Sequence, residues 1–228
     1  MGGGILTRTK LRDRQMPDYT KGEEIFNMTS HIVGGGIGVI VLALCVIRAA
    51  LHGNGWGVAG SVVYGTSMIL LYTMSSIYHG LHDGMGKRAL QVLDHCTIYF
   101  LIAGTYTPIL LSAMRRIDPL ASWILFGVVW GLAALAITLT AIDLRNYRVF
   151  SMICYIGMGW AIIVKAGLLM EALGMPGFWL LLSGGVAYTV GAILYGAGRK
   201  IRYMHSIFHL FVVLGSILQF LAIFLYAL

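Results

Sequence analysis

Charge is the scarcest property of this sequence. Only 11% of the 228 residues are Asp, Glu, Lys or Arg, whereas 58% are hydrophobic and the mean hydropathy is +0.83. A soluble domain of this length cannot bury so much apolar surface, so the composition excludes that class and indicates an integral membrane protein. Acidic residues are fewest, nine against sixteen Lys and Arg. In a membrane protein such an excess sets orientation, and we expect no nucleic-acid partner.

Cysteine is also rare. Cys45, Cys96 and Cys154 each lie within an apolar stretch, and no pair has the CxxC spacing. We interpret all three as small buried hydrophobic residues rather than as a disulfide framework or a thiol centre. They therefore say nothing about the redox compartment.

No low-complexity linker interrupts the apolar part of the chain. A membrane-spanning helix needs about 20 apolar residues, and seven stretches reach that length. They are about 28–51, 56–79, 92–114, 120–141, 149–171, 176–198 and 204–227. The short connections predict an all-α integral membrane protein, with one seven-transmembrane helix bundle over 28–228 and a polar cytoplasmic segment over 1–27. Glycine-rich segments such as 34–38 and 184–192 are typical of close helix packing in lipid.

The distribution of Lys and Arg predicts orientation. The first apolar stretch is long enough to span and has no small-residue cleavage site after it, so we expect an uncleaved signal anchor. With the N-terminus in the cytoplasm, twelve Lys and Arg lie inside and three outside, and Lys165 lies within the fifth stretch. The inner twelve are Arg8, Lys10, Arg12, Arg14, Lys21, Lys87, Arg88, Arg145, Arg148, Arg199, Lys200 and Arg202, and the outer three are Arg48, Arg115 and Arg116. This bias predicts a multi-pass protein of the plasma or inner membrane with its C-terminus outside.

Polar side chains from three of these stretches share one depth. Ser75 and His79 lie in the last turns of the second stretch, Asp94 lies near the start of the third, and His205 and His209 open the seventh. Because successive helices alternate in direction, all five are expected near the cytoplasmic face. The orientation rests on Lys and Arg alone, so the shared depth is an independent observation.

The types and spacing of these residues indicate a metal site. His205 and His209 lie one helical turn apart on one face, the spacing by which a single helix offers two nitrogens to a metal ion. His79 can supply a third nitrogen. Three neutral imidazoles and one water form an open tetrahedral zinc site of the kind used for hydrolysis. Asp94 is then placed to hold that water or to take its proton, and Ser75 to hydrogen-bond the water or a substrate carbonyl.

Each residue also has a purely structural interpretation. A histidine pair at a helix start can lie at the interface, satisfied by headgroups and water. Asp94 can be a helix N-cap, although the helical pattern of 87–91 places it inside the helix, and Ser75 can bond back to a helix carbonyl. His31 also lies at cytoplasmic depth, and we expect it to be an interface residue or a neighbour of the site rather than a ligand. Residues 17–27 can form a short interfacial helix before the first span.

From about Glu23 to its end, the chain resembles the hemolysin III proteins, bacterial-type relatives of the progestin and adipoQ receptors (PAQR) and, more distantly, of the alkaline ceramidases. The segments that carry the resemblance are GEEIFNMTSH at 22–31, SSIYH at 75–79, LDHCTIYFLIAGTYTP at 93–108 and HSIFH at 205–209. The order Ser-x3-His, then Asp, then His-x3-His is specific to that superfamily, and AGTYTP is a signature of its third helix, which Pro108 would bend.

The resemblance implies a seven-helix bundle with a zinc ion near the cytoplasmic face. Carried over residue by residue, the ligands are His79, His205 and His209, with Asp94 reaching the ion through water and Ser75 beside it. No metal position of this sequence departs from the pattern of the family.

Three functions remain open. The first is a zinc-dependent hydrolase of a membrane lipid amide or ester, for example a ceramide-like amide, in which Asp94 acts as base and Ser75 assists the oxyanion. The second is a non-enzymatic, receptor-like or membrane-homeostasis protein in which zinc clamps the second, third and seventh helices. Closed structural zinc sites usually have four protein ligands, so three nitrogens favour the enzyme. The third, a pore-forming haemolysin, ranks last because such a protein is expected to be soluble before insertion.

Overall fold

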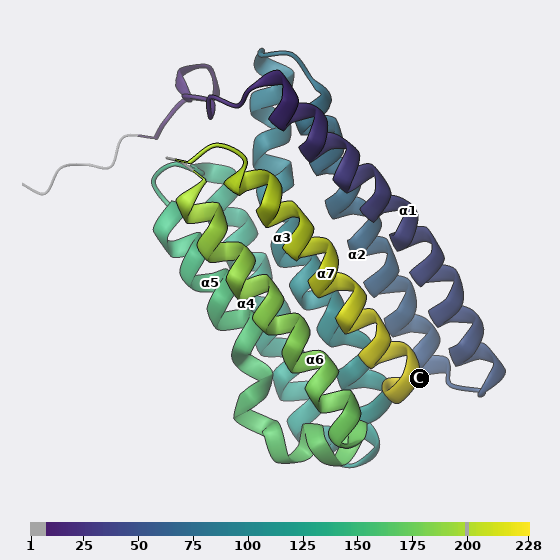
Figure 1. Cartoon of the computed structure of the whole chain (residues 1–228). Helices are drawn as coiled ribbons and strands as arrows, with labels where there is room; N and C mark the ends of the chain where they lie inside the picture. Colours follow the sequence, from purple (N-terminus) through teal and green to yellow (C-terminus); the bar gives the residue numbers. More distant parts are fainter. Residues whose placement is uncertain (1–7, 199–200) are drawn as a thin grey trace, which may run out of the picture.

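The computed structural model of the chain describes residues 8–198 and 201–228 (Figure 1). Within these residues the structure is helical and contains no strand, so the predicted all-α class is confirmed. The α-helices are α1 (Lys21–Leu51), α2 (Gly55–Gly80), α3 (Met85–Pro108), α4 (Pro119–Ile142), α5 (Arg148–Trp160), α6 (Ala166–Ala197) and α7 (Met204–Ala222). Short 3-10 or π turns are η1 (Leu11–Asp13), η2 (Ile109–Ala113), η3 (Met114–Arg116), η4 (Ala161–Lys165) and η5 (Ile223–Ala227).

Six helical segments of the described chain are long and apolar enough to cross a membrane. Five of them correspond to single predicted stretches: α1, α2, α3 with its extension to Arg116, α4, and α7 with its extension to Ala227. The sixth, Arg148–Ala197, is 50 residues long and contains both 149–171 and 176–198. The prediction of a multi-pass membrane protein is therefore confirmed.

The sixth segment is not a single straight helix. Gly174 has a φ of +66° and a ψ of 169°, outside the helical region. Glycine adopts such a positive φ without steric cost, and Pro176, two residues later, lacks the N–H that would continue the hydrogen-bond ladder. Figure 1 shows the chain turning back at the lower end of the bundle, where α5 gives way to α6.

Helix α1 begins before the first apolar stretch. Thr20 and Glu23 form a capping box, in which Glu23 N donates to the Thr20 hydroxyl (3.2 Å) and Thr20 N donates to the Glu23 carboxylate (2.8 Å). The polar residues 21–27 are therefore the first two turns of α1 rather than a separate interfacial helix. This extension carries Glu24 and Asn27 into the bundle.

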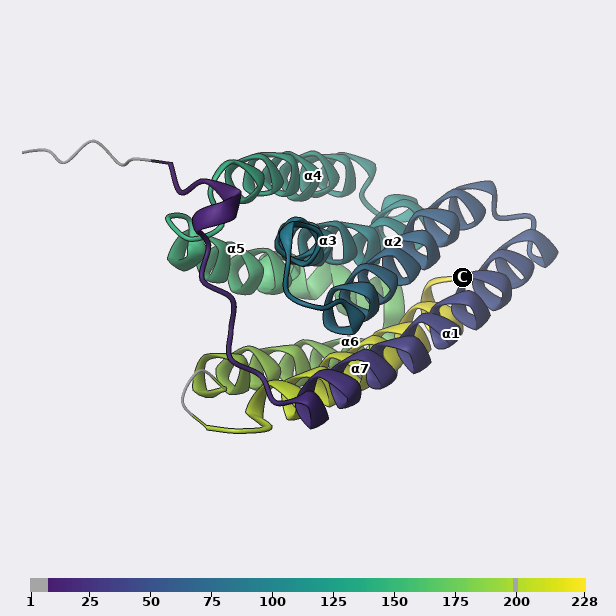
Figure 2. The ribbon, with the colours of Figure 1, turned by 90° about the horizontal axis from the view of Figure 1, so that it is seen from above.

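Close helix approach depends on glycine, as two positions illustrate. A Cβ atom added at Gly65 of α2 would lie 2.7 Å from Leu42 Cα of α1, and one added at Gly184 of α6 would lie 3.1 Å from the Gly215 carbonyl of α7. Small residues at such contacts are typical of helix packing in lipid. The most buried of the spanning segments is the one that begins with α3, and Figure 2 shows α3 near the centre of the bundle.

Residues 8–20, which we call the N-terminal strap, cross one end of the bundle from the α4–α5 connection to α1 (Figure 2). Three hydrogen bonds fasten the strap. Arg8 Nε donates to the Ile142 carbonyl (3.0 Å) and Thr9 N to Asp143 Oδ2 (2.7 Å). Arg88 Nη1 donates to the Arg12 carbonyl (3.2 Å). We call this end of the bundle the N-terminal face.

Candidate metal centre

Three histidines, which we call the histidine cluster, converge at the N-terminal face. His79 lies in the last turn of α2, and His205 and His209 lie in the first two turns of α7. One nitrogen from each lies within 4.8 Å of the other two, and all three side chains are buried. His205 Nε2 and His209 Nε2 are 3.1 Å apart. Tetrahedral zinc with Zn–N bonds of about 2.0–2.1 Å separates its nitrogens by about 3.3 Å, so the spacing of the His205–His209 pair suits the ion.

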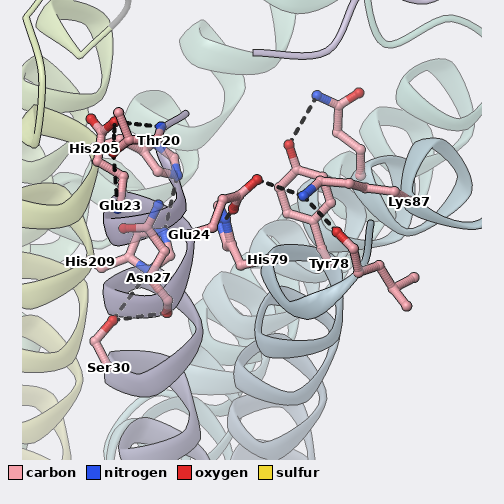
Figure 3. A network of polar contacts seen from close by, with 12 residues as sticks. Thr20, Glu23, Glu24, Asn27, Ser30, Tyr78, His79, Lys87, His205 and His209 are labelled. Atoms are coloured by element: carbon pink, nitrogen blue, oxygen red, sulfur yellow. Dashed lines mark hydrogen bonds and ion pairs between the residues drawn. The ribbon is translucent and has the colours of Figure 1, made fainter. Parts of the chain in front are cut away.

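A carboxylate from α1 fixes the orientation of His79. Glu24 Oε2 lies 2.5 Å from His79 Nδ1, and Glu24 Oε1 accepts a hydrogen bond from Lys87 Nζ of α3 (2.5 Å). Figure 3 shows Glu24 between His79 and Lys87, with His205 and His209 to one side. The contact with Glu24 assigns the proton of His79 to Nδ1 and leaves the lone pair of Nε2 free. A carboxylate behind a metal-binding histidine raises the basicity of the ligand and holds its ring.

The environment of His79 Nε2 shows whether a metal fits the cluster. His79 Nε2 is buried and has no hydrogen-bond partner among residues 8–198 and 201–228. A buried polar atom without a partner costs about 1–3 kcal/mol. A cation held between this nitrogen and the α7 pair removes that cost, because each neutral imidazole offers a lone pair. The residues present therefore fit a zinc ion.

Aromatic rings hold the α7 histidines in place. Tyr19 of the N-terminal strap stacks on His205, with ring centroids 4.9 Å apart and planes at 23°. His31 of α1 stacks on His209 at 3.7 Å and 17°. Burial, with smaller effects of Tyr195 and Glu24, raises the pKa of Tyr19 well above its ordinary value, so Tyr19 is a neutral phenol. The strap thus covers the histidine cluster with an uncharged ring.

Asp94 and Ser75 lie beside the histidine cluster but outside the group of converging nitrogens. Asp94 lies inside α3, where the helical pattern of 87–91 placed it, and not at the N-cap, which is Gly84. The Ser75 side chain of α2 lies close to the Asp94 side chain. Both line the same cavity as the α7 histidines. The structure therefore brings all five predicted residues to one end of the bundle, with Asp94 as a neighbour of the nitrogens.

His31 is a neighbour of the site, as the sequence indicated. Its ring contacts His209 and lines the cavity, but it is not among the three converging histidines of the described chain. Both of its ring nitrogens are buried and have no hydrogen-bond partner within residues 8–198 and 201–228.

The cavity beside the cluster is long and mostly apolar. Its volume is about 200 Å³, and Tyr19 and Asp94 line it at the N-terminal face. On α6 its lining extends from Tyr195 to Phe178. Seventeen residues of α-helix span about 25 Å along the axis. The cavity therefore reaches from the histidine cluster far into the apolar part of the bundle.

Comparison with known proteins places the whole of this site in one family. The family model described as Haemolysin-III related matches residues 19–220. The chain belongs to the haemolysin-III-related family. The resemblance that the motifs indicated is thereby confirmed, and the matched range includes every residue of the site from Tyr19 to His209.

Alignments with individual relatives cover most of the length of this haemolysin-III-related protein. Hemolysin-3 of Bacillus cereus is 41% identical over 214 residues, 94% of this chain and 95% of the relative. The Hemolysin-3 homolog of Bacillus subtilis (strain 168) is 35% identical over 208 residues, 91% and 96% of the two chains. The monocyte to macrophage differentiation factor of Homo sapiens is 27% identical over 197 residues, 82% and 79% of the two chains.

Sequence reasoning missed three residues of the haemolysin-III-related site. Glu24 lies in the segment GEEIFNMTSH, but no role was assigned to its carboxylate, and Lys87 was counted only as a charge that sets orientation. Tyr19 was treated as part of the polar N-terminal segment. The capping box at Thr20 was the available signal, because it starts α1 early enough to bring Glu24 to the depth of His79.

Proposed function

We propose that this protein is a zinc-dependent hydrolase that cleaves an amide or ester bond of a membrane lipid. One observation carries the proposal: the unpartnered Nε2 of buried His79 lies with the α7 nitrogens next to a long apolar cavity, which Asp94 and Ser75 also line. An open metal site next to an apolar cavity suits a substrate whose polar bond meets the metal while its chain lies among apolar side chains.

The proposed topology has seven spans, with the N-terminus in the cytoplasm and the C-terminus outside the plasma or inner membrane. A straight helix of 50 residues would be about 75 Å long, against about 30 Å for the hydrocarbon core. The positive φ of Gly174 supports two crossings by Arg148–Ala197. The bias of Lys and Arg toward the N-terminal face supports the orientation.

His79, His205 and His209 would hold the zinc, which when bound supplies Lewis acidity and lowers the pKa of water to about 7. Glu24 keeps the proton of His79 on Nδ1, so that Nε2 faces the site. The Asp94 carboxylate takes the proton of the attacking water, acting as general base. Ser75, close to that carboxylate, would offer its hydroxyl to the substrate carbonyl.

The lipid class follows from the shape and lining of the cavity. Each CH₂ group moved from water into an apolar environment is worth about 0.8 kcal/mol. A lining that continues along α6 from Tyr195 to Phe178 can accept a long acyl chain. Tyr19 covers the cluster from the side of the N-terminal strap and helps to exclude bulk water. A ceramide-like amide and its ester analogue are therefore the first substrates to test.

One observation favours a second candidate, a receptor-like or membrane-homeostasis protein with structural zinc. The converging nitrogens belong to α2 and α7, whereas the Asp94 carboxylate of α3 is not among them in the described chain. A zinc ion there would tie two helices together without turnover. Zinc-loaded wild-type protein that cleaves neither substrate would favour this candidate.

The test compares wild type with Asp94→Asn in nanodiscs, with zinc content measured in both. Asn can hydrogen-bond to water but cannot accept its proton, so we expect zinc to be retained and hydrolysis to fall by about 10²–10⁴-fold. Asp83→Asn is the matched control, because Asp83 is an exposed carboxylate in the α2–α3 connection. Full activity in zinc-loaded Asp94→Asn would refute the role of this carboxylate.

A further inference from the structure

Arg14 of the N-terminal strap is a buried cation without a counter-ion. Its side chain is buried, with the residue only 7% exposed, and its Nε and Nη1 atoms have no hydrogen-bond partner among residues 8–198 and 201–228. Burial lowers the pKa of Arg14 below its ordinary value, which reflects the unfavourable environment of the charge. Buried charges are normally paired, so this arrangement indicates a missing anionic partner.

Asp143, the acidic group that attracts Arg14, cannot act as that partner. Asp143 Oδ2 accepts hydrogen bonds from Thr9 N (2.7 Å) and Asn146 Nδ2 (2.9 Å). Asp143 Oδ1 accepts from Arg145 N (3.0 Å) and Asn146 N (3.1 Å). Although burial alone would raise it, these N–H groups hold the pKa of Asp143 below its ordinary value. The carboxylate is thus already fully used, and it attracts Arg14 only through space.

Arg14 lines a hollow between the N-terminal strap and two helices. The hollow has a volume of about 630 Å³, and the cations of Arg8, Lys10 and Arg14 line its strap side. Apart from Thr9, the rest of its wall is apolar and consists of Leu11, Ala89, Val92, Leu93 and Ala141. The hollow shares no lining residue with the cavity of the histidine cluster. Leu93 is half exposed, so the hollow lies next to the apolar outer surface of α3.

We propose that this hollow binds the phosphate headgroup of an anionic phospholipid. The Nε and Nη1 groups of Arg14 have no partner, and its planar guanidinium can present a fork of N–H donors to phosphate oxygens, which lysine cannot do. Lys10 and Arg8 add positive charge, as in basic pockets that bind lipid headgroups at the ends of membrane helices. Free phosphate would satisfy Arg14 but would leave Leu11, Val92 and Leu93 in contact with water, so the apolar wall selects the lipid as the source of the phosphate.

Binding of lipid to the delipidated full-length chain in neutral detergent tests this proposal. Native mass spectrometry would compare phosphatidylglycerol, phosphatidylcholine with the same acyl chains, and inorganic phosphate. We expect phosphatidylglycerol to bind in clear preference to the other two. Lys10→Gln should weaken its binding about five-fold, the effect of one cation near an anionic lipid surface, and Arg14→Gln about ten-fold or more because it also removes the paired donors.

The variants are chosen so that folding does not decide the result. Lys10 is exposed, so Lys10→Gln keeps the fold, and Arg14→Lys keeps the charge but loses the planar pair of donors. Lys21→Gln is the matched control, because Lys21 is exposed and lies outside the hollow, and it should bind lipid like wild type. Equal binding of phosphatidylcholine, binding of inorganic phosphate alone, or wild-type lipid binding by both Lys10→Gln and Arg14→Gln would overturn the proposal.

Discussion

Helix α7 carries two buried polar clusters that differ in one respect. Ser216 lies between two phenols, with Tyr72 OH 2.8 Å and Tyr188 OH 2.7 Å from its hydroxyl, and we call these three residues the Ser216 cluster. Two turns away, His209 and His205 face each other and His79. Both clusters are buried, but His79 Nε2 has no hydrogen-bond partner in the described part of the chain, whereas the hydroxyls of the Ser216 cluster are satisfied.

This difference distinguishes buried polar groups that stabilise the fold from buried polar groups that bind a ligand. A hydrogen-bonded group of hydroxyls in an apolar bundle is complete and adds rigidity. A cluster that keeps an unpaired lone pair is unfavourable until a ligand binds, so it is retained where a ligand is needed. Burial of polar residues in a membrane bundle therefore does not by itself indicate a site, whereas a lone pair without a partner among converging histidines does.

Loss of the metal should produce the largest effect. His209→Ala, or extraction of zinc with a strong chelator, should lower the melting temperature, because the ion links α2 to α7 and structural zinc contributes on the order of 10 kcal/mol in small domains. The measurement is a thermal profile in detergent, with zinc content determined in parallel. His52→Ala is the control, since His52 is exposed at the end of α1. An unchanged profile after demonstrated loss of metal would count against the link.

Removal of the carboxylate behind His79 should have an intermediate effect. Glu24→Gln keeps the size of the side chain but removes the charge shared by His79 Nδ1 and Lys87 Nζ. Loss of such a partner typically weakens metal affinity about 10–100-fold. Competition with a chelating dye measures that affinity, and Glu171→Gln, at an exposed carboxylate, should not change it. Unchanged zinc affinity in Glu24→Gln would show that Glu24 does not position His79.

Mutation of the Ser216 cluster should have the smallest effect, and it should change the stability of the fold but not zinc binding. Ser216→Ala leaves the hydroxyls of Tyr72 and Tyr188 without their shared partner, which should destabilise the fold by about 1–3 kcal/mol. Zinc content should stay at the wild-type value. A loss of zinc in Ser216→Ala would remove the distinction between the two clusters.

Local periodicity explains how much of the site could be predicted from the sequence. The i,i+4 spacing places His205 and His209 on one face of α7, and apolar run lengths with the alternation of helix direction place His79 and Asp94 at the same depth. Residue spacing and the length of an apolar run are properties of a single helix, so they can be read without knowing how the helices pack. The two apolar stretches on either side of Gly174 likewise marked the place where the structure departs from helical geometry.

Contacts between helices could not be predicted in the same way. That Glu24 faces His79 depends on the rotation of α1 and on its packing against α2, which apolar run lengths do not determine. Tyr19 reaches His205 because the N-terminal strap crosses the end of the bundle, a path that hydrogen bonds to Asp143 and Arg88 fix. The hollow around Arg14 depends on that same path.

Elemental analysis of the purified protein is the decisive measurement, because a metal should be bound at the cluster that lacks a partner and none at the Ser216 cluster. We predict about one zinc per chain in wild type and in Ser216→Ala, and loss of that zinc in His79→Ala. Wild-type protein without a transition metal, or His79→Ala with its full zinc content, would contradict the account.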